Sequence, residues 1–253
     1  MHMLIKGIEF KSGNKPVICV PVMGNDIDES IEKAKNAIGT KCPMIEWRMD
    51  CFSDYLELDK VRQVLDKLAG LCNNTVLLAT LRTVGQGGNA EIGSDKLGEY
   101  YTRLAGMHAA DLIDVEFFEL DKPGQVIKNI HEMGGKVITS HHDFAETPEV
   151  STMAMIYEEM LKGHADIVKL AVTPKDMTDV LNLLHVTNDF SVDYPETPAV
   201  AMSMGKLGVI SRMCGEAYGS CITFGALGES SAPGQVGVDD LTQVLNIIHQ
   251  NYV

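Results

Sequence analysis

A lysine inside an apolar run is the residue of this chain whose type and position most clearly indicate chemistry. Lys169 lies in residues 165–172, which read Ala-Asp-Ile-Val-Lys-Leu-Ala-Val, a pattern typical of a buried parallel strand. Removal from water disfavours a charged amine, lowers its pKa and leaves a nucleophile that can attack a carbonyl. The alternative is a lysine whose stem packs while its ammonium reaches solvent. The run alone leaves both interpretations open.

Polar residues recur at the ends of other apolar runs. In residues 44–49, the two-residue period of a strand puts Glu46 and Arg48 on one face. Arg82 ends the next run and Arg212 lies after a later one, and a guanidinium suits an anion because it can bind a carboxylate through two parallel hydrogen bonds. We expect these two arginines to bind an anionic small molecule. Two further acidic residues, Asp114 and Glu116, are also expected in a strand. For them we favour a buried network of charges that compensate one another.

Two adjacent histidines, His141 and His142, follow a further run. Histidine titrates near neutrality and can transfer a proton to or from a substrate. Consecutive strand residues point to opposite faces, so the pair is not expected to bind one metal ion, and no metal site is predicted.

The elements that must position these residues alternate between strand and helix. Eight apolar runs are expected to be strands: 16–22, 44–49, 76–81, 112–116, 136–140, 167–172, 199–204 and 221–224. Amphipathic stretches between them are expected to be helices: 28–38, 59–71, 95–107, 123–133, 148–162, 176–188 and 241–249. The pattern predicts an α/β fold, a (β/α)8 TIM barrel whose active site lies at the carboxyl ends of the strands.

The N-terminal segment and the loops refine this prediction. Residues 4–11 are expected to form one half of a hairpin that closes the bottom of the barrel. An open doubly wound sheet would normally carry a glycine-rich fingerprint after its first strand, and Val22-Met23-Gly24-Asn25-Asp26 is no such motif. The small residues of 228–235 suit hydrogen bonding to substrate hydroxyls. Gly205 and Gly208 could instead bind a phosphate, as loops at that corner of a barrel often do.

Composition limits the class of protein. A chain of 253 residues fits one barrel, so residues 1–253 are expected to form a single domain. The net charge of −14 argues against a nucleic-acid partner, and no run of about twenty apolar residues predicts a membrane span. The six cysteines show no metal-ligand or redox spacing, which favours reduced thiols and a cytoplasmic location.

Six motifs, taken in order, resemble the type I 3-dehydroquinate dehydratases over nearly the whole chain. They are Glu46-Trp47-Arg48, Arg82, Ser140-His141-His142-Asp143-Phe144, Asp166-Ile167-Val168-Lys169, Met202-Ser203-Met204-Gly205 and Ser231-Ala232-Pro233-Gly234-Gln235. The resemblance implies a lyase of the shikimate pathway toward aromatic amino acids, a homodimer, and an anionic small-molecule substrate, 3-dehydroquinate. It implies no cofactor, because a covalent imine activates the substrate.

The resemblance also implies a role for each matching residue. Lys169 would form the Schiff base, His142 would be the general acid and base, and Arg212 would hold the substrate carboxylate. The residues that would line the pocket and order its hydroxyls are Glu46, Arg48, Arg82, Ser231 and Gln235, and the apolar walls would be Met202, Met204 and Phe224.

One position departs from the family's pattern. Gln86 stands where the family usually has a glutamate that pairs with the catalytic histidine. An amide accepts a hydrogen bond but supplies no charge, so His142 is expected to lose basicity and proton transfer to slow, without loss of Schiff-base formation.

Three other functions compete with the dehydratase. A class I aldolase also uses a barrel lysine and an imine, but would cleave its substrate into two fragments. A barrel that binds a carboxylate without catalysis is the second, and a metal-dependent lyase, which a chelator would inactivate, is the third.

Overall fold

The computed structural model describes residues 3–228 and 232–252. Its first element is an antiparallel hairpin of β1 (Met3–Ile5) and β2 (Ile8–Phe10), joined by a tight turn in which Lys6 and Gly7 both have positive φ. Residues 4–11 were expected to supply one half of a hairpin, and this was wrong. They contain most of both strands, because Lys6-Gly7 turns the chain within the segment.

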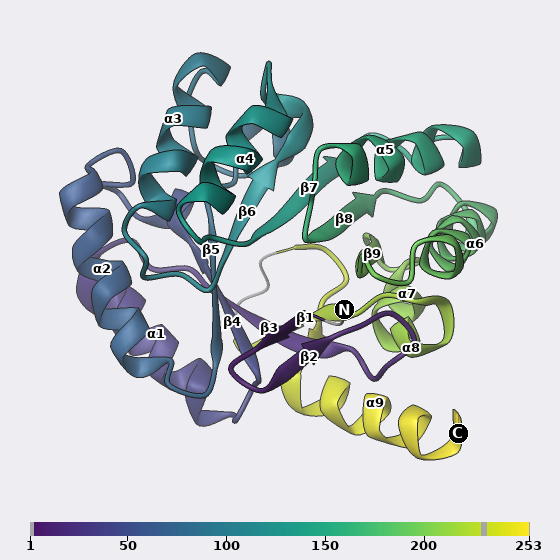
Figure 1. Cartoon of the computed structure of the whole chain (residues 1–253). Coiled ribbons are helices and arrows are strands. Elements are labelled where there is room, and N and C mark those ends of the chain that lie inside the picture. The colour runs from purple at the N-terminus through teal and green to yellow at the C-terminus, as the bar shows by residue number, and fades with distance from the viewer. Residues whose placement is uncertain (1–2, 229–231, 253) are drawn as a thin grey trace.

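The central element is a parallel sheet curled into a barrel (Figure 1). Its strands follow one another in the order β11-β10-β3-β4-β5-β6-β7-β8-β9. Their bounds are β3 Val17–Val22, β4 Met44–Arg48, β5 Val76–Thr80, β6 Leu112–Glu116, β7 Val137–Asp143, β8 Ile167–Val172, β9 Ala199–Ser203, β10 Ile222–Ala226 and β11 Val236–Gly237. The eight expected strands are β3 to β10, so the predicted barrel is confirmed.

The ring closes between its last two strands through backbone contacts instead of a full ladder. The N–H of Cys221 donates to the carbonyl of Ala199 at 2.8 Å, and the N–H of Val17 donates to the carbonyl of Cys221 at 2.8 Å. Ser220 also donates from its hydroxyl toward the carbonyl of Ala201, 3.5 Å away. The first and third of these bonds join β9 to the segment that enters β10, and the second joins that segment to β3.

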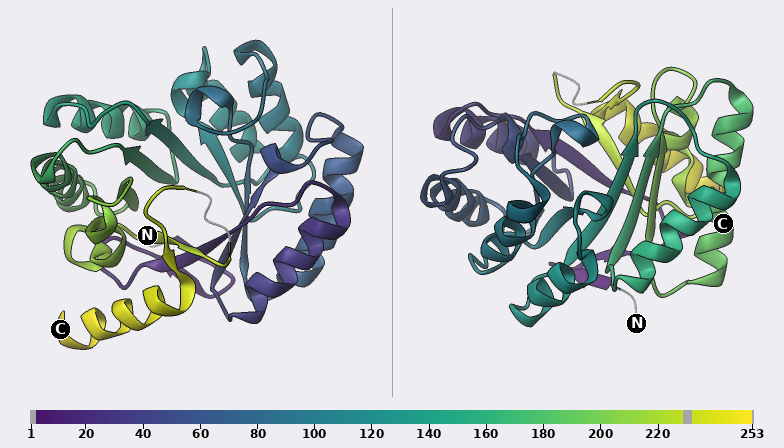
Figure 2. Two further views of the ribbon diagram at one scale, coloured as in Figure 1. Left: turned by 180° about the vertical axis from the view of Figure 1, so that it is seen from behind. Right: turned by 90° about the horizontal axis from the view of Figure 1, so that it is seen from above.

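Helices cover the outside of the barrel (Figures 1 and 2). They are α1 Ile27–Gly39, α2 Leu58–Leu71, α3 Ser94–Ala105, α4 Pro123–Glu132, α5 Val150–Lys162, α6 Met177–Asp193, α7 Val209–Met213, α8 Gly215–Tyr218 and α9 Val238–Tyr252. Three single turns of 3₁₀ helix follow strands or loops, η1 Met49–Cys51, η2 Val84–Gln86 and η3 Phe117–Glu119. The helix α6 was expected to end at Asn188, but buried Phe190 extends its apolar face, and it ends before Pro195. Within the described ranges, no helix is both long and apolar enough to cross a membrane.

Two apolar clusters hold the fold together. The larger lies between the strands and the surrounding helices, and the smaller fills the inside of the barrel. Ile5 and Phe10 of the hairpin belong to the inner cluster, and Figure 2 shows the hairpin at the end of the barrel opposite the loops that follow the strands. Lys6 fixes it there by donating to Asp111 (2.6 Å) and to the carbonyl of Cys72 (2.7 Å). The hairpin therefore closes the lower end, as expected, and leaves the upper end for a site.

Candidate active site

Lys169 lies inside the barrel near the middle of β8, and its side chain is only 4% exposed. Its Nζ is 3.3 Å from Oδ2 of Asp114, 4.0 Å from Oε1 of Glu46 and 4.6 Å from the centre of the Phe224 ring. The alternative in which the ammonium reaches solvent is therefore wrong. The amine faces two carboxylates and an aromatic ring.

A buried network of opposite charges surrounds the lysine. Arg82 donates to Asp114 (2.8 Å), Glu116 (2.9 Å) and the hydroxyl of Ser140 (2.9 Å). Burial would lower the pKa of Arg82, but the charges of Asp114 and Glu116 outweigh this and raise it. Burial would likewise raise the pKa of Asp114, but Arg82 and Lys169 outweigh it and lower the pKa. The predicted compensating network of Asp114 and Glu116 is present, and it occupies the guanidinium that we expected to bind an anion.

Glu46 and Arg48 project from the same face of β4, as their spacing predicted. Arg48 binds both carboxylate oxygens of Asp50, at 2.7 and 2.8 Å, and Glu46 accepts a hydrogen bond from the hydroxyl of Thr80 at 2.9 Å. Glu46 is buried. The pair places one carboxylate and one guanidinium at the mouth of the barrel.

His142 lies on β7, two residues after Ser140, the register partner of Lys169. Its Nδ1 is 3.3 Å from Oε1 of Gln86, and the same oxygen accepts the backbone N–H of His142 at 2.6 Å. Desolvation, then the positive charges of Arg82 and Lys169, lower the pKa of His142 well below its usual value. The imidazole is therefore neutral near pH 7 and can act as a base.

His141 does not line the cavity, although its Nδ1 lies 3.5 Å from Nε2 of Gln86. Its ring packs edge-on against Phe118 at 5.2 Å between centres, whereas His142 lines the same cavity as Lys169. The prediction that the two histidines face opposite ways is confirmed. In the described part of the chain, no three or more His, Cys, Asp or Glu side chains lie close enough together to hold a metal ion.

Arg212, on α7, is almost fully buried and differs from the other arginines of the site. It donates to the carbonyl of Pro233 (3.1 Å) and to the sulfur of Met202 (3.7 Å), and within residues 3–228 and 232–252 its Nε has no hydrogen-bond partner. Desolvation lowers its pKa to about 10. A buried cation with neutral neighbours is costly, and an anionic ligand would offset that cost.

These side chains meet in one cavity at the upper end of the barrel. Its volume is about 50 Å³, which is room for a few water molecules. The predicted residues that line it are Glu46, Arg48, Arg82, Gln86, His142, Lys169, Met202, Met204, Phe224 and Gln235. Arg212 lies behind Met202, and Ser231 is outside the described residues. Further lining residues, to which the sequence assigned no role, are Gly87, Phe144, Ala171 and Ala232.

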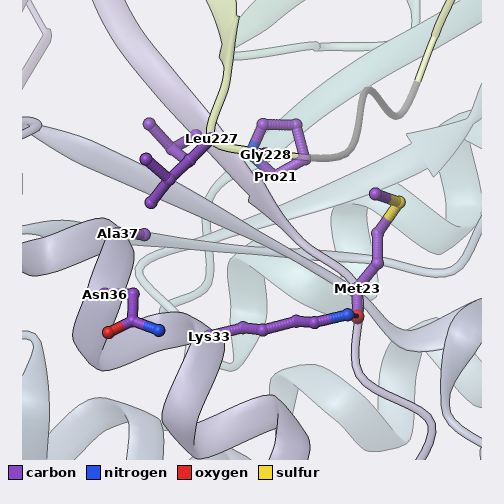
Figure 3. Close-up of a pocket in the computed structure, with 8 residues that line it drawn as sticks. Pro21, Met23, Lys33, Asn36, Ala37, Leu227 and Gly228 are labelled. Atoms are coloured by element: carbon purple, nitrogen blue, oxygen red, sulfur yellow. Dashed lines mark hydrogen bonds between the residues drawn. The ribbon is translucent and has the colours of Figure 1, made fainter. Parts of the chain in front are cut away.

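A larger pocket of about 300 Å³ lies between α1 and the chain after β10 (Figure 3). Figure 3 shows Lys33 reaching across it to Met23, and its Nζ donates to the Met23 carbonyl at 2.7 Å and pairs with Glu29 at 2.7 Å. The other labelled side chains that line it are apolar, apart from the amide of Asn36. The described residues of this pocket include no acid–base pair comparable to His142 and Lys169, so the smaller cavity is the better candidate for catalysis.

Glu119 contacts the site from behind and was not selected from the sequence. It lies on η3, directly after β6, and accepts a hydrogen bond from Nε2 of Gln86 at 2.8 Å. A polar residue just past the carboxyl end of a barrel strand is the one signal that could have pointed to it.

The fold is a (β/α)8 barrel, and its candidate site places a buried lysine and a neighbouring histidine at the carboxyl ends of the strands. The sequence model of the family described as type I 3-dehydroquinase matches residues 18–252. This chain belongs to that family.

Its relatives match it over nearly their whole length. It is 37% identical over 252 residues to a 3-dehydroquinate dehydratase of Clostridium botulinum (strain Eklund 17B / Type B), covering 98% of this chain and 97% of the relative. A crystal structure of 3-dehydroquinate dehydratase from Geobacillus kaustophilus HTA426 has a TM-score of 0.94 at 29% identity, covering 100% and 98% of the two chains. The type I enzyme from Clostridium difficile with covalently modified comenic acid also has a TM-score of 0.94, at 37% identity, covering 99% and 98%.

Proposed function

We propose that this protein dehydrates 3-dehydroquinate to 3-dehydroshikimate through a Schiff base on Lys169. The observation that carries the proposal is the buried amine of Lys169, which lines one small cavity together with His142 and Met202. The sulfur of Met202 in turn contacts the guanidinium of Arg212. Membership of the type I family and the full-length match to 3-dehydroquinate dehydratases support the choice of substrate.

The reaction begins when Lys169, having lost a proton, attacks the ketone carbon of the substrate. The tetrahedral adduct loses water and gives a protonated imine, a cation that withdraws electrons from the adjacent carbon. The carboxylates of Asp114 and Glu46, 3.3 and 4.0 Å from Nζ, stabilise this cation as they stabilise the ammonium. The covalent imine thus supplies the activation, and we propose that no metal, nucleotide or flavin takes part.

His142 then removes a proton from that adjacent carbon to give an enamine. The enamine expels the hydroxyl group of the next carbon, and His142 returns its proton to the departing oxygen. Hydrolysis of the imine releases 3-dehydroshikimate and restores the amine of Lys169. A neutral imidazole suits the first of these steps, and burial and the neighbouring cations keep His142 in that form.

Substrate binding divides between charged and apolar walls. Arg212 would hold the carboxylate, because its guanidinium is buried without a described acidic partner. The hydroxyls would meet Glu46, Arg48, Arg82 and Gln235, and the proposed contact of Ser231 stays a prediction. Met202, Met204 and Phe224 would cover the apolar face of the ring.

Gln86 is proposed to limit the rate of proton transfer. Its Oε1 contacts His142 but carries no full charge, so the imidazolium gains less stabilisation than a carboxylate would provide. The amine of Lys169 has no contact with Gln86 among the hydrogen bonds of the described residues, and imine formation is expected to proceed normally.

Mass spectrometry after borohydride reduction tests the proposal. Incubation with 3-dehydroquinate and borohydride should add the mass of the reduced substrate to the peptide that contains Lys169, and Lys169→Met should abolish the addition. Modification of another peptide would overturn the assignment.

Product analysis separates the alternatives. Dehydration gives a conjugated enone, which absorbs in the ultraviolet, whereas a class I aldolase would release two fragments. Binding without turnover would favour a barrel that only holds a carboxylate, and loss of activity with a chelator would favour a metal-dependent lyase.

We further propose that the chain acts as one domain, as a homodimer and in the cytoplasm. Exposed apolar side chains on α5 and α6, among them Met155, Leu181 and Val192, offer a surface for a second copy. Light scattering coupled to gel filtration would give the mass in solution, and a monomer at micromolar concentration would contradict the dimer.

A further inference from the structure

Three side chains form a hydrogen-bonded chain behind the cavity. Oε1 of Glu119 accepts from Nε2 of Gln86 at 2.8 Å, and Oε1 of Gln86 accepts the backbone N–H of His142 at 2.6 Å. The same oxygen lies 3.3 Å from Nδ1 of His142. Gln86 is buried and Glu119 is half-buried, so this series of hydrogen bonds runs from the protein surface to the imidazole.

The groups at the two ends of this series of hydrogen bonds, the Glu119 carboxylate and the backbone N–H of His142, determine which way the amide of Gln86 points. A carboxylate can only accept a hydrogen bond, and a backbone N–H can only donate one. Reversing the amide would place its oxygen against Glu119 and its NH₂ group against the N–H of His142. Both contacts would then be repulsive, so Glu119 and the backbone of His142 together fix the oxygen toward the imidazole. Nδ1 of His141, 3.5 Å from the same Nε2, is a second and more distant acceptor for the NH₂ group.

The orientation of Gln86 in turn determines the tautomer of His142. Because Nδ1 faces an oxygen that only accepts, the neutral ring carries its proton on Nδ1 and leaves the lone pair on Nε2. That lone pair is the one available to the substrate. Second-sphere partners of this kind commonly fix the tautomer and the orientation of a working histidine.

We propose that Glu119 is a positioning residue for proton transfer by His142 and acts through the amide of Gln86. This inference rests on the proposed role of His142 as general acid and base. Glu119 does not touch the substrate; it keeps the acceptor of Gln86 directed at Nδ1.

The structure also predicts how a carboxylate at position 86 would behave. In Gln86→Glu, two carboxylates would face each other at the present Nε2–Oε1 distance of 2.8 Å. Like charges so close cannot both stay ionised without moving apart, and either response reduces the stabilisation that a carboxylate at position 86 would otherwise give to the His142 imidazolium. Adding Glu119→Gln restores a complementary pair, because the new amide donates to the new carboxylate.

The experiment compares kcat, KM and the borohydride adduct in single variants at positions 86, 91 and 119 and in the double variant. Glu119→Met removes the acceptor and should lower kcat about 10- to 100-fold, the usual effect of losing such a partner, with little change in KM. Glu119→Gln keeps an acceptor oxygen and should recover most of that loss. Glu91→Gln removes a charge from the same surface hollow without contacting Gln86 and should leave kcat unchanged.

The decisive measurement is the effect of Glu119→Gln in two backgrounds. In the wild type, where Gln86 is present, it should lower kcat slightly. In the Gln86→Glu variant it should raise kcat, so the sign of the effect reverses. A merely structural role predicts the same effect in both backgrounds, and that result, or an unchanged kcat in Glu119→Met, would overturn the inference.

The adduct separates this inference from the proposed function. Formation of the Lys169 adduct at an unchanged rate in all the Glu119 variants is expected. Absence of the adduct in the wild type would refute the Schiff-base function itself, whereas a normal adduct with an unresponsive kcat would refute only the role of Glu119. Thermal unfolding of each variant checks that the fold is intact, and Glu119→Gln keeps the test valid if Glu119→Met unfolds.

Discussion

Lys169 and Asp114 form a buried ion pair, with 3.3 Å between Nζ and Oδ2. The same oxygen of Asp114 accepts a hydrogen bond from Arg82 at 2.8 Å. One carboxylate therefore contacts both cations inside the barrel, and Glu116 and Glu46 add further negative charge beside Arg82 and Lys169. The pair holds the amine at the centre of the mouth and offers a negative charge to any cation formed on that nitrogen.

Replacing Asp114 by asparagine should destabilise the protein strongly. The buried cations of Arg82 and Lys169 would share one negative charge fewer, and removing one partner of a buried pair costs about 3 kcal/mol or more. Urea unfolding of the free enzyme would measure this. Asp66→Asn, which removes an exposed carboxylate paired with Arg62, is the matched control and should cost less than about 1 kcal/mol. Equal losses in the two variants would contradict the central role of Asp114.

Replacing His142 by alanine should separate the two halves of the reaction. The imine on Lys169 should still form, because its nucleophile is a different residue, while elimination should slow by about 10²- to 10⁴-fold for want of an acid and base. Borohydride trapping reports the first step and enone absorbance reports the second. His185→Ala, which removes an exposed histidine of α6 that pairs with Asp189, is the control and should leave elimination nearly unchanged. Near-normal elimination in His142→Ala would demote His142 to a structural histidine.

Much of the fold is predictable because a parallel barrel repeats one simple pattern. Apolar runs such as that of β6, bounded by helices that begin with proline or an acidic residue, identify each strand without knowledge of the others. The short helices α7 and α8 were missed, since four or five residues give too little periodicity. The turn at Lys6 was missed because a lysine with positive φ has no sequence signature of its own.

The site was predictable as a set of residues, but not as a set of contacts. Strand-end positions and the family resemblance selected Lys169 and His142. Two contacts follow only from how the strands assemble. Asp114 is the partner of Lys169, and Glu119 reaches Gln86 across 33 residues of sequence. Sequence spacing within one strand determines the face on which a residue lies, whereas contacts between strands depend on register and on side-chain rotamers.

Replacing Arg212 by methionine should weaken substrate binding. The guanidinium is buried, and loss of a buried charged contact to an anion costs about 2–5 kcal/mol, which corresponds to a rise in KM of roughly 30-fold or more. Steady-state kinetics would measure the rise in KM. Binding itself would be measured in the Lys169→Met variant, by comparing the shift in melting temperature that the substrate produces with and without the Arg212→Met change. An unchanged KM would assign the carboxylate to another residue, such as Arg48.

Acidification should destabilise the native state through His142. Desolvation and the charges of Arg82 and Lys169 lower its pKa in the folded protein, whereas in the unfolded chain the pKa is about 6.5. Between these two values the unfolded state binds more protons, so the free energy of unfolding falls as the pH drops below about 6.5 toward the folded pKa. His142→Asn removes this dependence and should flatten the curve of stability against pH in that window. Urea unfolding across the window would test it, and parallel curves for the two proteins would show that the imidazole is not held in its neutral form.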